Sequence, residues 1–133
     1  MPSRRQADPA AVDRALAAVD ADTEPARADL AAAVRQLANA LARQAPGKAV
    51  ELRVPPFAAV QCVEGLRHTR GTPPNVVETD PVTWLCLATG RLTWAAATDD
   101  GRVRATGSRA DLSAYLPVTG RGPAHVPMAG GST

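Results

Sequence analysis

The segment DPVTWLCLATGRLTWAAATDDGRVRATGSRADLSAYL, residues 80–116, holds the clearest succession of helix, turn and strand signals in this chain. Asp80-Pro81 predicts the start of a helix, because aspartate accepts hydrogen bonds from free amides and proline is tolerated in the first turn. Apolar residues keep one stripe along the next ten positions. Gly90 is expected to end this helix in the left-handed conformation that glycine adopts easily.

Shorter elements follow in the same segment. Thr93 is a candidate cap for a short helix from Trp94 to Thr98. Asp100-Gly101 predicts a turn into a strand over Arg102–Thr106, where apolar and polar residues alternate. A last short helix is expected over Leu112–Leu116, ended by Pro117.

The residues before this segment predict two helices and three strands. Asp8-Pro9 starts a short alanine-rich helix, and Ala26–Ala45 is the longest helix, with leucine and valine repeating every three or four positions. Strands are expected over Lys48–Val54, Phe57–Glu64 and Asn75–Thr79. The second strand is apolar on both faces, which predicts that both are covered or that one faces a cavity.

Composition limits the functions open to this protein. The chain has 133 residues, 45% of them hydrophobic but only 3% aromatic, which suits one domain with an aliphatic core. A formal net charge of +2 is too small to indicate nucleic-acid binding. The sequence shows no run of eighteen apolar residues and no signal-peptide core, so we expect a cytoplasmic protein.

The residues that could catalyse a reaction or bind a metal form no recognisable motif. The sequence contains no nucleophile elbow and no phosphate-binding glycine loop. Cys62 and Cys86 are expected to be small buried hydrophobes. His68 has no second metal ligand near it in the sequence. The sequence therefore predicts neither an enzyme nor a metal or other cofactor.

The spacing of residues in the C-terminal half resembles that of a known family. The pattern DP-x-x-W-x-x-L-x-x-G-x-L-x-W-x-x-A, followed by G-x-V-x-A-x-G-x-x-x-D-L-x-x-x-L, is similar to the C-terminal half of the sterol carrier protein superfamily. The upstream stretches VPPFAAVQCVEG and HTRGTPPNVVETDP resemble a bacterial branch found in actinobacteria. The resemblance covers roughly Glu24 to Leu116.

This resemblance implies an α+β fold. The expected fold has a mixed four- to five-stranded sheet, covered by a long N-terminal helix and short C-terminal helices. The expected organisation is an N-terminal arm and short helix over residues 1–22, the sterol-carrier-like domain over 23–117, and a disordered tail over 118–133.

The resemblance also implies a hydrophobic ligand, such as a lipid or fatty acyl chain, between sheet and helices. The wall of that site is expected to comprise eight residues: Val60, Cys62, Trp84, Leu85, Leu92, Val103, Leu112 and Leu116. The low aromatic content leaves open the alternative that the interior is filled. A continuous apolar cavity would favour a carrier, and a filled core would favour an interaction module.

The segment GLRHTRGTPP, residues 65–74, is a basic loop without acidic residues. Arg67, His68 and Arg70 could hold a carboxylate or phosphate, such as the head group of an acidic lipid. The alternatives are a solvated loop neutralised by Glu64 and Glu78, or a contact surface for an acidic partner protein without any small ligand. The sequence does not identify the ligand, the protein partner or the oligomeric state.

Overall fold

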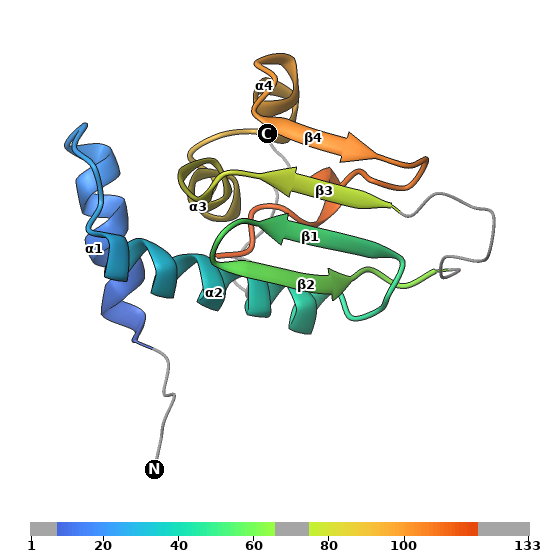
Figure 1. Ribbon diagram of the computed structural model, residues 1–133, viewed down its shortest axis with the longest axis horizontal. Coiled ribbons are helices and arrows are strands. Elements are labelled where there is room, and N and C mark those ends of the chain that lie inside the picture. The colour runs from blue at the N-terminus through green and yellow to red at the C-terminus, as the bar shows by residue number, and fades with distance from the viewer. Residues whose placement is uncertain (1–7, 66–74, 120–133) are drawn as a thin grey trace, which may run out of the picture.

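The computed structural model describes residues 8–65 and 75–119 and has two layers, a sheet and a set of helices (Figure 1). Its elements follow in the order α1 (Pro9–Asp20), α2 (Arg27–Gln44), β1 (Val50–Val54), β2 (Ala58–Cys62), β3 (Val76–Thr79), α3 (Pro81–Thr89), α4 (Trp94–Asp99) and β4 (Val103–Thr106). A turn of 3-10 helix spans Ser113–Tyr115. The α+β class expected from the sequence is confirmed.

Within the described residues the sheet has four strands, in the order β2-β1-β3-β4. β1 pairs antiparallel with β2 and parallel with β3, while β3 pairs antiparallel with β4. Leu52 in the centre of β1 therefore lies opposite Val60 on one side and Val77 on the other. The predicted mixed sheet is confirmed.

Only one face of the sheet carries the core. Val50, Leu52 and Val54 are buried, whereas Arg53 between them is exposed. The expectation that Phe57–Glu64 would be covered on both faces, or face a cavity on one, is wrong, because Ala59 is exposed. A small alanine on the outer face of an edge strand needs no cover, since little apolar area is left in water.

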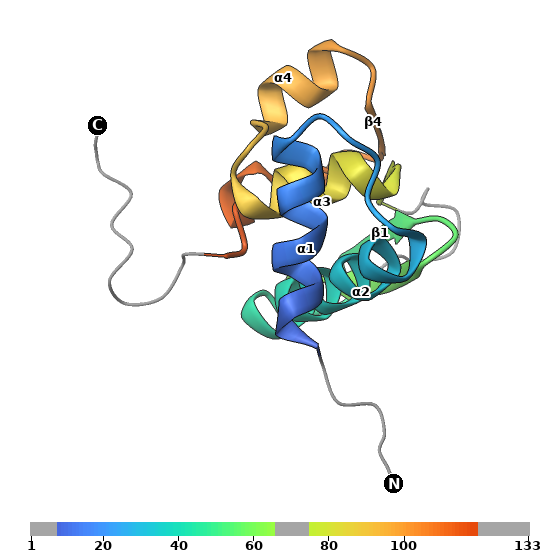
Figure 2. The same cartoon turned by 90° about the vertical axis from the view of Figure 1, so that its left-hand side faces the viewer.

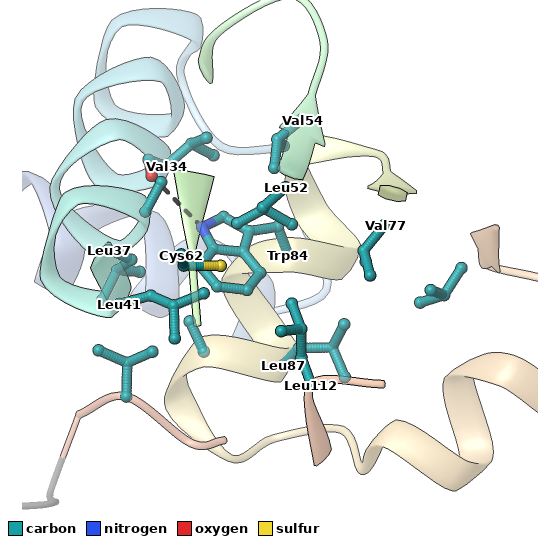
Figure 3. Close-up of a cluster of buried hydrophobic side chains, with 14 of the residues drawn as sticks. Val34, Leu37, Leu41, Leu52, Val54, Cys62, Val77, Trp84, Leu87 and Leu112 are labelled. Carbon is teal, nitrogen blue, oxygen red and sulfur yellow. Dashed lines mark hydrogen bonds between the residues drawn. The ribbon is translucent and has the colours of Figure 1, made fainter. Parts of the chain in front are cut away.

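The two central helices pack together beside this face. Leu37 and Leu41 of α2 lie in the core with Trp84 of α3, as Figure 3 shows, together with Leu52 and Cys62 from the sheet. The expected helix stripe therefore does face the sheet. Because these side chains are apolar and closely packed, burial of apolar area is the main source of stability.

The signals at the ends of α3 are confirmed. Asp80 accepts a hydrogen bond from the Thr83 backbone N–H at 3.0 Å, and Pro81 occupies the first turn. Gly90 ends the helix with φ 85°, in the left-handed region. Thr93 likewise caps α4 by accepting from the Ala96 N–H at 3.1 Å.

Helix α1 lies across the helical layer, in front of α2 and α3 in Figure 2. Its buried residues are alanines, Ala11 and Ala15, which allow the backbones of α1 and α2 to approach closely. Arg14 joins α1 to Asp29 at the start of α2 through an exposed ion pair of 2.9 Å. Packing rather than this exposed pair holds α1 in place.

The C-terminal region differs from the prediction in two respects. The expected helix over Leu112–Leu116 is only the 3-10 turn Ser113–Tyr115, because Pro117 forces the preceding Leu116 into extended backbone. Val118, expected to begin a disordered tail, is buried, and its N–H donates to the Ala88 carbonyl at 2.7 Å. Residues 120–133 lie outside the described residues. Among the helices described, none has the length and apolar character needed to cross a membrane.

Candidate functional site

Most of the predicted ligand wall is part of the close-packed core. Cys62, Leu85 and Leu112 have no exposed area, Trp84 is 1% exposed, and Val103 is 8% exposed. Figure 3 shows Trp84 surrounded by side chains from α2 and the sheet. These five residues pack against the rest of the core. A filled core at these positions favours the interaction module over a carrier that holds its ligand between sheet and helices.

Trp84 connects the helices as well as filling the core. Its indole Nε1–H donates to the backbone carbonyl of Val34 in α2 at 3.3 Å. The hydrogen bond satisfies the single polar atom of a buried tryptophan, which would otherwise be costly to bury. Trp84 is therefore held by packing and by a hydrogen bond within the protein.

The two cysteine thiols are poorly suited to nucleophilic chemistry. Burial raises the pKa of the Cys62 thiol to about 11. Burial also raises the pKa of Cys86, and the nearby Arg102 and Arg91 only partly oppose this shift. Since the thiolate is the reactive form, both side chains behave as small buried hydrophobes.

Leu92 and Leu116, unlike the core residues, line a pocket open to the surface. We call it the α3–α4 pocket, and its volume is about 320 Å³. Nine residues line it: Leu87, Gly90, Leu92, Thr93, Trp94, Ala95, Ser113, Leu116 and Pro117. Val60, the remaining residue of the predicted wall, is half-buried against the core and is not among them.

Local sequence signals shape the α3–α4 pocket. The left-handed Gly90 turns the chain away from α3, and the Thr93 cap then starts α4 with Trp94 at its first position. The 3-10 turn and the extended Leu116 bring the C-terminal segment to the other side. Three short segments thus enclose a space that no regular element fills.

Sequence reasoning missed Trp94 as a pocket residue. It assigned this side chain only to the start of a short helix. The informative signal was length, because the six residues of α4 offer too little surface to bury a large aromatic side chain. Trp94 accordingly remains half-buried at the pocket.

The charged groups next to the α3–α4 pocket already have partners. The Arg91 guanidinium, between Gly90 and Leu92 in sequence, donates from Nε and Nη2 to the Asp20 carboxylate at 2.8 Å each. This bidentate pair lowers the pKa of Asp20 and links α1 to the α3–α4 connection. Asp111, two residues before Ser113, accepts the Ser113 N–H at 2.8 Å.

A second and more polar pocket, of about 500 Å³, lies near the N-terminus of α3. Its lining is Pro55, Glu78, Thr79, Asp80, Gly101, Arg102 and Arg104. Both signs of charge are present, and the Asp80 carboxylate is already occupied by Thr83. This mixture suits neither an apolar ligand nor a simple anion.

Arg67, His68 and Arg70 lie outside the described residues, so the anion-binding hypothesis stays a prediction. In the described part of the chain, no group of three His, Cys, Asp or Glu side chains could hold a metal ion.

Comparison with protein families identifies a match over most of the chain. A family model described as bacterial SCP ortholog, where SCP stands for sterol carrier protein, matches residues 26–118 of the 133-residue chain. The matched range contains α2, the sheet, α3, α4 and the buried Val118, and it leaves out α1. A search among curated proteins finds no match.

Proposed function

The chain belongs to the family of bacterial sterol carrier protein orthologues, and from this premise we propose that it binds and carries a hydrophobic small molecule, a lipid or fatty acyl chain, without enzymatic chemistry. The α3–α4 pocket is the proposed site. Leu92 and Leu116 keep the role that the sequence suggested, and Leu87, Trp94 and Pro117 join them. The remaining members of the predicted wall act as the core that supports the site.

One observation carries the choice of this pocket. Aliphatic and aromatic side chains line an open volume of about 320 Å³ there. Small-molecule sites are typically concave, mostly apolar and about 300–1,000 Å³ in volume, so this pocket falls at the small end of the range. A single alkyl chain suits it better than a bulky polycyclic ligand.

A pair of tryptophan substitutions on α4 tests the site. Ala95 lines the pocket, whereas its neighbour Ala96 is also exposed but is not among the lining residues. Ala95→Trp should fill the pocket and weaken binding of a neutral apolar fluorophore, such as N-phenylnaphthylamine, by about tenfold or more. Ala96→Trp should leave the affinity unchanged.

Equal affinities of the parent and both variants would place any binding elsewhere. No binding to the parent, together with no lipid in native mass spectra of protein purified from cells, would reject the carrier function.

A further inference from the structure

The lining of the α3–α4 pocket contains no ionisable side chain among the described residues. The polar side-chain groups of its lining residues are the hydroxyls of Thr93 and Ser113 and the indole N–H of Trp94. The Thr93 hydroxyl accepts from the Ala96 N–H, and hydroxyls can donate as well as accept. Such groups can hydrogen-bond an uncharged oxygen, but they do not neutralise an anion.

Among residues 8–65 and 75–119, the charges near this lining do not favour an anion either. Arg91 lies in sequence between Gly90 and Leu92 of the lining. Its Nε and Nη2 atoms both donate to the Asp20 carboxylate of α1. On the side of the C-terminal segment, a hydrogen bond with Ser113 lowers the pKa of Asp111 and keeps it negative. Asp99, at the end of α4, adds another acidic residue to these elements.

A free carboxylate or phosphate that enters this lining would therefore lose hydration without gaining a cation from the described residues. Burying an unpaired charge is far more costly than burying an ester or hydroxyl oxygen that finds a hydrogen bond. A ligand with a neutral head avoids this cost and keeps the contacts of its alkyl chain. The pocket should thus bind lipids with neutral head groups more tightly than lipids with anionic head groups.

We infer that the α3–α4 pocket selects uncharged lipids, such as a fatty alcohol or an esterified acyl chain, over the free fatty acid of the same length. The selection follows from the uncharged lining and from the Arg91–Asp20 pair, which engages the guanidinium of the residue between Gly90 and Leu92 of the lining. This inference rests on the proposed function, since it describes the ligand of the same site.

The direct test compares decanol with decanoate, which share an alkyl chain and differ in charge. Binding is followed by the fluorescence of Trp94, with Trp94→Phe as the control that removes the signal from the pocket. At about pH 8 decanol should bind at least about tenfold more tightly than decanoate, which is ionised there. Equal affinities, or tighter binding of decanoate, would overturn the inference but leave the carrier function intact.

Lowering the pH should narrow this difference. Carboxyl groups have an ordinary pKa near 4, so the neutral form of decanoate becomes a substantial fraction only between about pH 6 and about pH 4. Over that range the apparent affinity of decanoate should rise several-fold toward that of decanol, while the affinity of decanol stays flat. A flat decanoate curve beside measurable binding would show that the anion itself is accepted, against the inference.

A pair of substitutions on α1 tests the role of the ion pair. Asp20→Asn removes the partner of Arg91, whereas Asp13→Asn removes the same charge from an exposed position of the same helix. Asp20→Asn should raise decanoate affinity several-fold and leave decanol affinity unchanged, and Asp13→Asn should change neither. If Asp20→Asn behaves as Asp13→Asn does, the ion pair does not set the selectivity. If neither probe binds the parent, the proposed function itself fails.

Discussion

At the scale of single residues, Trp84 shows how one side chain can join two helices and a sheet. It is 1% exposed, it packs on residues from α2 and β1, and its indole N–H bonds to the Val34 carbonyl. Its burial was predictable from the helix stripe beside it. Its partner was not, because the Val34 carbonyl lies fifty positions earlier in the chain.

Truncation of this side chain should be among the most damaging substitutions in the core. Trp84→Ala is expected to cost about 3–5 kcal/mol of the free energy of unfolding, as other large aromatic truncations do. Trp84→Phe should cost less, because it keeps a ring and loses the hydrogen bond. Urea denaturation measures both, with Trp94→Ala as the half-buried comparison. A loss for Trp84→Ala no larger than for Trp94→Ala would contradict this account.

The Cys62 thiol should make stability depend on pH in the alkaline range. Its pKa is about 11 in the folded protein, against an ordinary value of 9.0. Between these values the unfolded chain binds fewer protons than the folded one, so the free energy of unfolding falls as pH rises. Below about pH 9 the thiol is neutral in both states and contributes no slope.

Comparing the parent with Cys62→Ala isolates this contribution. The variant should be less stable throughout because it leaves a small cavity. The gap between the two curves should narrow from about pH 9 to about pH 11, since only the parent loses the Cys62 contribution there. Chemical denaturation at a series of pH values measures the difference in the free energy of unfolding between the two proteins. A difference that stays constant from about pH 9 to about pH 11 would refute the raised pKa of Cys62.

At the scale of elements, the ends of α3 and α4 were predictable because each signal acts within four residues. Asp80 and Thr93 each cap a helix through their own side chain, and Gly90 supplies the left-handed exit. The C-terminal 3-10 turn was not predicted. Apolar spacing there favoured a helix, but the restriction that Pro117 imposes on Leu116 was stronger.

The left-handed glycines allow a matched test of backbone strain. Gly90 has φ 85° and Gly101 has φ 73°, so an alanine at either position adopts an unfavourable conformation. An added Cβ at Gly90 would lie 3.6 Å from Pro117, an ordinary contact, and at Gly101 it would meet no heavy atom within 4 Å. Gly90→Ala and Gly101→Ala should therefore each cost about 1 kcal/mol.

Thermal denaturation of the two variants checks this expectation. A much larger loss for Gly90→Ala would mean that the neighbouring Pro117 cannot tolerate the added carbon. A negligible loss for both would show that these turns relax to another conformation.

At the scale of the whole molecule, local patterns predicted the elements better than the site. Periodicity identified the strands within two residues at each end, and the family resemblance supplied a mixed sheet of four to five strands but not the order β2-β1-β3-β4. A ligand pocket, in contrast, depends on which apolar side chains are left without neighbours. Leu85 and Leu92 have the same hydrophobic character in the sequence, yet the first is in the core and the second is at the pocket.

The C-terminal boundary of the fold provides the last prediction, which separates Val118 from the residues after it. Val118 is 2% exposed, its N–H donates to Ala88, and its carbonyl accepts from the Gln44 side chain at 3.4 Å. Ending the chain after Pro117 should cost about 1.5–3 kcal/mol, the usual value of burying such a side chain. Ending it after Thr119 should change stability by less than about 0.5 kcal/mol, because the sequence beyond carries no hydrophobic period.

Urea denaturation of the two truncated chains measures the difference, with Val118→Ala in the full chain as the control for the side chain alone. Equal stability of the two truncations would show that Val118 adds nothing to the core, and a loss on ending after Thr119 would show that residues 120–133 contribute to the fold.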